Sequence, residues 1–192
     1  AKFLYQSRVP ADFCSQPEPR GRLSQNPDNA TLFQNWMQRR MLSRVVLSPE
    51  PEYHSGLGLD ADVTATSPIR KYFDLVTQRQ LLSCFGLEKG YSADEIKQII
   101  QQVQQPLTHA ATTQTRRFRY WMLKYLEGRI GRKEEAIVLD KRWDKYTILL
   151  TAYLLECRMP VSGGWELKPG DLIQITIQHI NARQDKIAVI LG

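Results

Sequence analysis

The sequence predicts an α+β fold, with a mainly helical part over residues 1–132 and a small five-stranded β-barrel over residues 133–192. In the first part, apolar side chains recur at the spacing of one helix face, for example over residues 96–103. Beyond Lys133 they alternate with polar side chains, which is typical of half-buried strands. This change of period predicts two domains that meet near residue 132.

The composition favours a partner with many negative charges. The chain has 192 residues, a net charge of +6 and a pI near 9.3. Its three cysteines are far apart in the sequence and form no C-x-x-C pair, so we expect reduced thiols and a cytoplasmic location. No apolar run approaches the roughly 18 residues of a membrane span, so no membrane association is expected.

The first residues, AKFLYQSRVP, resemble the end of a helix already under way, which predicts a preceding segment. An irregular connection rich in Pro, Ser and Asn follows to residue 29. An amphipathic core helix should begin at Asn29. We assign the cations on its other side, including Arg39 and Arg40, to a solvated face in preference to RNA contact. The shared apolar face consists of Leu32, Phe33, Trp36, Met37 and Met41.

A helix start is predicted at Thr66-Ser67-Pro68, because Ser67 can cap the helix and Pro68 suits its first position. This places Arg70 in the first turn, where the helix dipole disfavours a cation by up to about 1 kcal/mol. Two interpretations remain open. Arg70 either contacts a phosphate at the helix start or is a surface arginine paired with Asp74.

Two more helices should follow. The first has a capping box of Ser92 and Glu95 and should end before Pro106. The second should run from about Thr108 to Glu127, with three cations near its middle: Arg116, Arg117 and Arg119.

Five short strands within about 60 residues fit a closed barrel of the OB type. The first hairpin of this barrel bears Lys141, Arg142, Trp143 and Tyr146. Aromatic rings between cations suit single-stranded nucleic acid, because rings stack on bases while cations hold the backbone. The alternative is that both aromatic rings pack the end of the barrel.

No catalytic motif is evident in the sequence. There is no G-x-S-x-G, Walker loop or H-E-x-x-H motif, and the three histidines are isolated from one another. Asp60 and Asp62 are spaced as a metal-binding pair could be, but two carboxylates make an incomplete site. We therefore expect no metal-binding residues in this chain.

The stretch ATSPIRKYFDLVTQR, residues 65–79, closely resembles the signature of the RNB catalytic domain of ribonuclease II and ribonuclease R type exoribonucleases. His54-Ser-Gly-Leu57 resembles a motif just upstream of that signature, and RYWMLKYL resembles the helix that closes the domain. The predicted barrel resembles the OB-fold RNA-binding domain that follows RNB in these enzymes. The resemblance implies the C-terminal portion of an RNB domain followed by an OB-fold domain.

This resemblance implies a processive, hydrolytic 3′-to-5′ exoribonuclease that threads single-stranded RNA to a magnesium site and releases nucleoside monophosphates. It implies that Arg70 is catalytic and contacts phosphate near the scissile bond, and that Asp74 and Arg79 form a structural pair. It also implies that His54, Thr66, Ser67 and Tyr72 bind RNA. The basic helix and the hairpin add further expected RNA-binding residues, which are Arg116, Lys141, Arg142, Trp143 and Tyr146.

The family's metal-binding aspartates lie upstream of the residues matched here. Mg²⁺ is therefore expected to be bound outside this chain, on a preceding N-terminal polypeptide, and the chain alone is expected to be inactive. Two positions also depart from the family pattern: Asp62 replaces an aromatic residue and Thr115 an acidic one. The alternative function is a non-catalytic RNA-binding module that retains the RNB scaffold.

Overall fold

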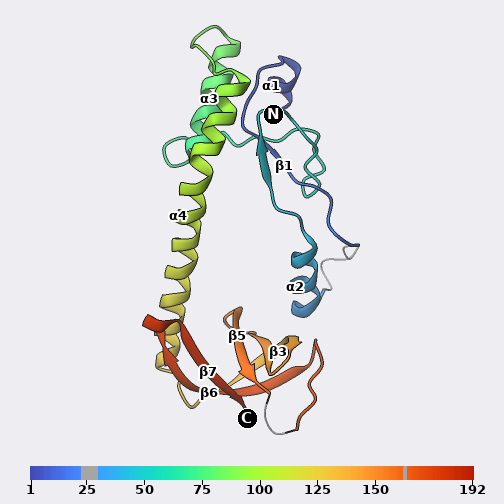
Figure 1. Cartoon of the computed structure of the whole chain (residues 1–192), viewed down its shortest axis with the longest axis vertical. Coiled ribbons are helices and arrows are strands. Elements are labelled where there is room, and N and C mark those ends of the chain that lie inside the picture. Colours follow the sequence, from blue (N-terminus) through green and yellow to red (C-terminus); the bar gives the residue numbers. More distant parts are fainter. Residues whose placement is uncertain (23–29, 162–163) are drawn as a thin grey trace. The chain divides into compact units, whose positions relative to one another are not determined.

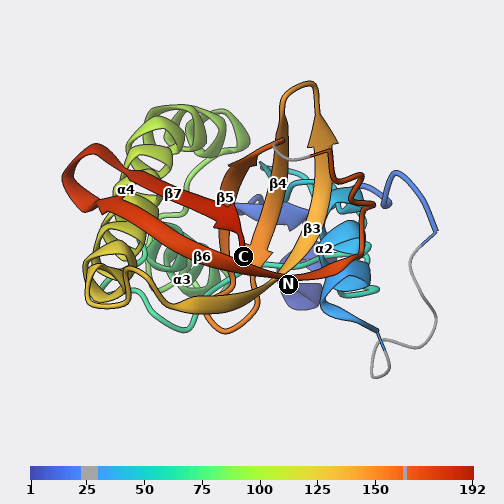
Figure 2. The same ribbon diagram turned by 90° about the horizontal axis from the view of Figure 1, so that it is seen from below.

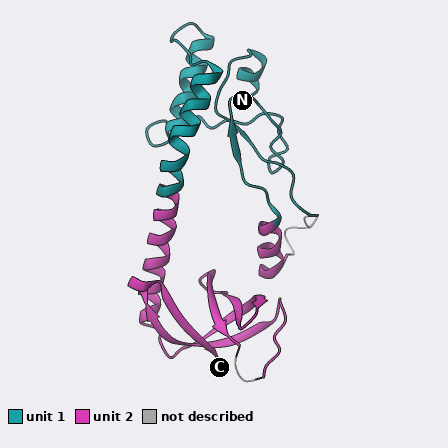
Figure 3. Ribbon diagram, viewed as in Figure 1, with its two compact units in different colours: residues 1–23, 41–109 teal, residues 24–40, 110–192 magenta. Residues whose placement is uncertain are grey.

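The computed structural model describes residues 1–22, 30–161 and 164–192 (Figure 1, and from below in Figure 2). The chain divides into two compact units: residues 1–23 with 41–109, and residues 24–40 with 110–192 (Figure 3). The predicted α+β fold is confirmed. The predicted domain boundary near residue 132 stays a prediction, because unit 2 also contains residues that precede it. Among the described residues, no helix is both long and apolar enough to cross a membrane.

Unit 1 combines three helical segments with a two-stranded sheet. Its elements in chain order are α1 (Lys2–Gln6), β1 (Phe13–Ser15), β2 (Val46–Ser48), α3 (Tyr72–Cys84) and the start of α4 (Ala93–Glu127). Strand β1 pairs antiparallel with β2, although the sequence predicts an irregular connection there. One small core forms around Leu4 and Phe13, and another joins α3 to α4 through Phe73, Val76 and Ile96.

Helix α3 begins at Tyr72, so the predicted start at Pro68 is wrong. Residues 68–70 instead form a turn in which the N–H groups of Arg70 and Lys71 donate to the Ser67 carbonyl at 3.2 and 3.0 Å. Lys71 is extended, with φ −120° and ψ 111°, which separates the turn from the helix. The Ser67 side chain therefore does not cap α3.

The two helices predicted on either side of Pro106 are one helix, α4. Its capping box is confirmed, since the Ser92 N–H donates to Glu95 Oε2 at 2.7 Å and the Glu95 N–H donates to Ser92 Oγ at 3.2 Å. Pro106 cannot bond the Gln102 carbonyl, but both residues are exposed, so water can satisfy that carbonyl. Strong helix formers around one exposed proline therefore keep the helix continuous.

Unit 2 is a nearly closed barrel of the predicted OB type. Its antiparallel strands lie in the order β5-β4-β3-β6-β7, and β5 contacts β7. The strands are β3 (Lys133–Arg142), β4 (Lys145–Leu150), β5 (Leu155–Pro160), β6 (Leu172–Asn181) and β7 (Lys186–Leu191); a 3₁₀ turn, Ala182–Gln184, precedes β7. Figure 2 shows these strands curving around one another.

Helix α2 (Leu32–Met41) belongs to the same unit as the barrel. Thr31 and Gln34 form its capping box, with bonds of 2.9 and 3.2 Å. The predicted start at Asn29 lies outside the described residues. No side chain of α2 is fully buried, so it is not the core helix that was predicted.

Alternation along the strands separates two faces of the barrel. Inward side chains such as Val138, Tyr146, Ile148 and Ile175 form the main core. The outer face carries a second apolar cluster of Ile137, Leu139 and Leu149, against which Phe33 and Trp36 of α2 pack.

Candidate nucleic-acid interface

The turn before α3 is held by Asp74, which is fully buried. Its carboxylate accepts the Thr64 hydroxyl at 2.6 Å and the Ser67 N–H at 2.8 Å. Burial acts to raise the pKa of Asp74, but these hydrogen bonds outweigh it and hold the pKa below its ordinary value of 3.8. Asp74 is therefore ionised at neutral pH and fixes the shape of the turn.

Arg70 lies at the end of this turn with its side chain exposed. Its Nη2 donates to the Ser67 hydroxyl at 3.3 Å, and no ion pair to it is present among the described residues. The predicted pairing with Asp74 is absent. A guanidinium tethered by a neutral hydroxyl keeps its charge and most of its donors available for a phosphate.

The predicted structural pair of Asp74 and Arg79 is also wrong, because each has separate partners. Arg79 donates to the Lys89 carbonyl at 3.1 Å and to the Tyr91 hydroxyl at 2.8 Å, and its guanidinium lies over the Tyr91 ring. Arg79 therefore ties α3 to the loop before α4, whereas Asp74 ties α3 to the turn before it.

The other predicted residues of unit 1 differ in their accessibility. Thr66 and Tyr72 are exposed, Ser67 is half-buried, and His54 is only 8% exposed. The Nδ1 atom of His54 is buried without a hydrogen-bond partner in the described part of the chain. His54 therefore presents little surface to a ligand in this conformation.

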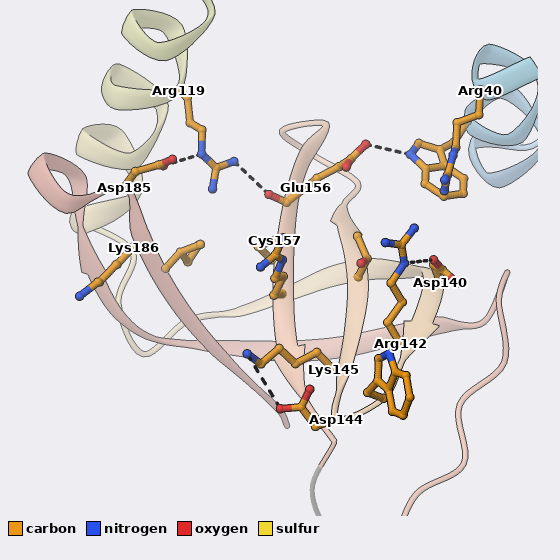
Figure 4. Close-up of a pocket in the computed structure, with 15 residues that line it drawn as sticks. Arg40, Arg119, Asp140, Arg142, Asp144, Lys145, Glu156, Cys157, Asp185 and Lys186 are labelled. Carbon is orange, nitrogen blue, oxygen red and sulfur yellow. Dashed lines mark hydrogen bonds and ion pairs between the residues drawn. The ribbon is translucent and has the colours of Figure 1, made fainter. Parts of the chain in front are cut away.

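A groove of about 1040 Å³ lies on the barrel in unit 2. Its floor is the outer face of β3, β4 and β5, and the β3–β4 turn and the start of β7 also line it (Figure 4). In OB folds this is the face, with these loops, that binds oligonucleotides. The lining residues are Trp36, Arg40, Arg119, Asp140, Arg142, Trp143, Asp144, Lys145, Thr147, Glu156, Cys157, Arg158, Asp185, Lys186 and Ile187.

Strand register arranges the floor in rows that cross the three strands. One row contains Ile137, Leu149 and Glu156. The next row contains Asp140, Thr147 and Arg158, and the third contains Arg142, Lys145 and Pro160. The floor thus changes from apolar to basic toward the β3–β4 turn.

The acidic side chains of the groove all have partners. Asp185 accepts from Arg119 at 2.5 Å, and Asp140 from Arg142 at 3.1 Å (Figure 4). Asp144 lies 3.9 Å from Lys145 Nζ, and Glu156 accepts the indole N–H of Trp36 at 2.8 Å.

Three cations of the groove have no acidic partner among the described residues: Arg40, Arg158 and Lys186. The lining contains six Arg or Lys side chains and four Asp or Glu side chains, so the groove is net positive. The groove therefore attracts a polyanion.

The two aromatic residues of the predicted hairpin differ in their exposure to solvent. Trp143 is 99% exposed at the β3–β4 turn, where its φ is 47°. Tyr146 is 1% exposed, and its hydroxyl donates to the Trp165 carbonyl and accepts the Leu167 N–H. The Tyr146 ring belongs to the core and is closed to a base, because strand alternation turns it inward.

The remaining predicted cations vary in their surroundings. Lys141 Nζ lies 5.6 Å from the Tyr146 ring centre, and Arg142 pairs with Asp140. Arg116 is exposed on α4 and does not line the groove.

Sequence reasoning missed Arg158 and Lys186, and it assigned Trp36 and Arg40 to other roles. Alternation in the segment 145–161 could have placed Arg158 outward, but the register between β4 and β5 could not be predicted. No local signal shows that α2 lies against a barrel whose strands begin at residue 133.

The described residues do not fit a catalytic metal site. Within residues 1–22, 30–161 and 164–192, no three His, Cys, Asp or Glu side chains converge to hold a metal ion.

Burial raises the pKa of Cys14 to about 11 and that of Cys157 to about 12, so both thiols are protonated at neutral pH and unsuited to nucleophilic attack.

Comparison with known proteins relates this chain to ribonucleases. The RNB domain family model matches residues 11–85. Over 97% of this chain, an uncharacterised ribonuclease of Synechocystis sp. is 27% identical, and the chloroplastic/mitochondrial ribonuclease II of Arabidopsis thaliana is 26% identical. The chain spans 28% and 24% of the lengths of these two relatives. Exoribonuclease 2 of Aeromonas hydrophila is 58% identical over 43 residues, which are 22% of this chain and 6% of that protein.

Solved structures share the fold over the whole chain. The Dss1 exoribonuclease of Candida glabrata matches with a TM-score of 0.85 at 18% identity, over 100% of this chain and 26% of that protein. Mycoplasma genitalium RNase R, in complex with ribose-methylated single-stranded RNA, matches with a TM-score of 0.78 at 16% identity, over 100% of this chain and 39% of that protein.

Proposed function

Because residues 11–85 match an RNB domain and the chain is homologous to ribonucleases of the ribonuclease II type, we propose that it is the C-terminal portion of an exoribonuclease. The whole enzyme would act processively on single-stranded RNA in the 3′-to-5′ direction and release nucleoside monophosphates. The homology over 97% of the chain is the observation that carries this proposal.

Magnesium, which the resemblance implies, would be held by residues outside this chain. The described residues offer no converging set of three donors for it. A preceding polypeptide would therefore complete the active site, and a cytoplasmic location would suit the three free cysteines.

Arg70 would bind a phosphate of the RNA near the scissile bond. Its exposure supports this role, as does its lack of an acidic partner in the part of the chain that the structure describes. The turn that Asp74 fixes next to it supports the role as well. A guanidinium held there could stabilise negative charge that develops on a phosphate during hydrolysis. Thr66, Ser67 and Tyr72 would position the same strand of RNA, and His54 could contact it only through the small part of its side chain that is exposed.

The barrel groove would also bind single-stranded RNA. Trp143 is fully open for stacking on a base, and Arg158 and Lys186 can neutralise phosphates. Lys141, Arg142 and Arg116 would add to the positive surface. Tyr146 has no direct part in binding here, because its ring is buried.

A test of this function compares the longer protein with residues 1–192 alone. The longer protein should shorten a single-stranded RNA in a magnesium-dependent way, whereas residues 1–192 should bind the RNA and leave its length unchanged. Denaturing gels of a 5′-labelled oligoribonucleotide measure the shortening, and native gels of the same RNA measure the binding. Full-rate degradation by residues 1–192 would contradict the proposal of an outside metal site.

The same assay tests the alternative of a non-catalytic RNA-binding module that retains the RNB scaffold. Binding without shortening by the longer protein would support that module. Failure of both proteins to bind RNA would reject both functions.

A further inference from the structure

We propose that helix α2 supplies a second nucleotide-binding contact to the barrel groove, in which the guanidinium of Arg40 stacks on a base of single-stranded RNA. This inference rests on the proposed RNA-binding function of the groove. It adds a residue that lies 93 positions before the first barrel strand in the sequence.

Helix α2 is attached to the barrel by an apolar patch. Ile137, Leu139 and Leu149 point outward from the sheet, yet they are only 6%, 2% and 6% exposed. Phe33 and Trp36 cover them, and the Phe33 ring lies 3.5 Å from where a Cβ on Gly170 would be. Removing such a patch from water favours a docked helix.

Trp36 joins α2 to the floor of the groove. It packs on Leu149, and its indole N–H donates to Glu156, which lies opposite Leu149 in the same row. This bond occupies an oxygen of the only acid in that row. One side chain therefore fixes the position of α2 and engages a negative charge that would repel RNA.

Arg40 lies over the Trp36 ring, with its Cζ 4.6 Å from the ring centre. It is exposed, it lines the groove, and it forms no ion pair among the described residues. Stacking on indole orients a guanidinium plane and lowers its freedom, and such planes are surfaces on which unpaired RNA bases stack. The Trp36–Arg40 pair is thus a charged platform open to the groove.

The two ends of the groove are far enough apart for several nucleotides. Leu149 belongs to the patch that Trp36 covers, and it lies five positions along the chain from Asp144, at the turn that carries Trp143. At about 3.4 Å per strand residue this is roughly 17 Å, the length of about five stacked nucleotides. A long RNA can contact Arg40 and Trp143 together, whereas a trinucleotide can occupy only one end.

The experiment measures the Kd of the 192-residue chain for fluorescein-labelled oligouridylates of three and nine nucleotides by fluorescence anisotropy. Arg40→Ala should raise the Kd for the nonamer about fivefold or more, and Trp36→Ala should do the same through loss of positioning. Arg40→Lys, which keeps the charge without the plane, should recover less than half of the loss in free energy. For the trimer, Arg40→Ala should change the Kd less than twofold.

Arg39→Ala is the matched control, since Arg39 is an exposed cation of the same helix that does not line the groove. Its Kd should stay within about twofold of the wild-type value. Trp143→Ala tests the groove itself and should weaken nonamer binding. Circular dichroism confirms that each variant is folded.

Each other outcome overturns a defined part of the scheme. If Arg40→Lys binds like wild type, Arg40 acts only as a charge and base stacking is wrong. A second outcome is that Trp143→Ala weakens nonamer binding while Arg40→Ala has the same Kd as Arg39→Ala, or a lower Kd than wild type. In that case the inference about α2 is wrong, and RNA binding by the groove is still supported. If neither Arg40→Ala nor Trp143→Ala weakens binding, RNA binding by the groove fails.

Discussion

Asp74 shows how one buried carboxylate can hold an exposed arginine in place. It forms no hydrogen bond with Arg70, but it fixes Thr64 and Ser67, and Ser67 in turn accepts from the backbone and side chain of Arg70. The exposed Arg70 side chain is therefore held in position indirectly, by the buried carboxylate of Asp74. Preorganisation of this kind lowers the reorganisation that a phosphate contact costs.

Replacing Arg70 in the longer protein should lower turnover more than RNA affinity. Arg70→Ala should reduce kcat by about 10²-fold or more, because the arginine would act mainly on charge that develops in the transition state. Arg70→Lys should recover only part of the loss, since an ammonium cannot grip two oxygens. Single-turnover kinetics and RNA binding measure the two effects separately.

Arg44→Ala serves as the control for this experiment, because Arg44 is another exposed arginine of unit 1. It should leave both quantities unchanged. A fall in affinity without a fall in kcat for Arg70→Ala would contradict the transition-state role.

Asp12 makes the stability of unit 1 depend on pH. It is 1% exposed, and burial raises its pKa from 3.8 to about 7 despite the hydrogen bond from Thr77 at 2.9 Å. Between these values the folded protein retains a proton that the unfolded chain has lost. Stability should therefore fall as the pH rises from 4 to 7, by up to about 1.4 kcal/mol per pH unit.

Asp12→Asn should remove this dependence. Relative to wild type, the free energy of unfolding of the variant should increase by about 2 kcal/mol between pH 5 and pH 7, because only the wild type loses stability over this range. Urea unfolding at the two pH values measures it, with the exposed Asp60→Asn as the control. Parallel pH profiles for wild type and Asp12→Asn would show that Asp12 titrates normally.

Residue-level prediction succeeded where a side chain's role follows from its own motif. The capping box of Ser92 and Glu95 is local and was predicted correctly. The different roles of Trp143 and Tyr146 in the hairpin could not be predicted in the same way. Tyr146 turns inward with the strand, whereas Trp143 lies in a turn with positive φ, and composition alone does not distinguish these positions.

At the level of elements, helix α4 carries a proline where the sequence predicts a break. Pro106 removes one hydrogen bond to residue 102, and its exposed position limits the damage because water replaces the bond. The helix has 13 residues before Pro106 and 21 after it, and these outweigh a local penalty that short-range rules overestimate.

Pro106→Ala should stabilise the protein by about 1–3 kcal/mol, because it restores a backbone bond in an exposed helix interior. Thermal unfolding followed by circular dichroism at 222 nm measures the change. Gln105→Ala, at the neighbouring exposed position, should shift stability by less than about 0.5 kcal/mol. A destabilised Pro106→Ala would mean that a bend at this proline is needed for packing.

The barrel strands were predicted well because a period of two is local and five such segments occur together. Strands β1 and β2 were harder to predict, because each has only three residues and they lie 31 positions apart. The groove required the register of three strands and the docking of α2. Both depend on long-range packing, which a single sequence does not display.

Considered as a whole, the chain combines a net charge of +6 with a groove in which three cations have no acidic partner within residues 1–22, 30–161 and 164–192. If all three neutralise RNA phosphates or lie close to them, log Kobs against log salt should have a slope near −2, at about 0.7 per contact on a single strand. Lys186→Ala should make the slope shallower by about 0.7. Titrations between 50 and 300 mM KCl provide the slope.

Lys97→Ala removes an equal charge from unit 1 and should leave this slope unchanged. Equal shifts for Lys97→Ala and Lys186→Ala would indicate that net charge, and not the groove, governs binding.

The docking of α2 on the barrel also affects how the protein is made. Phe33 and Trp36 leave the ribosome about 100 residues before β3, and at about 5–20 residues per second they wait about 5 to 20 seconds for Ile137 and Leu149. During that time the two rings are uncovered and open to chaperones or to other nascent chains. A barrel synthesised without α2 would keep the complementary patch exposed and should be prone to aggregate, so the early helix also protects the barrel that is synthesised after it.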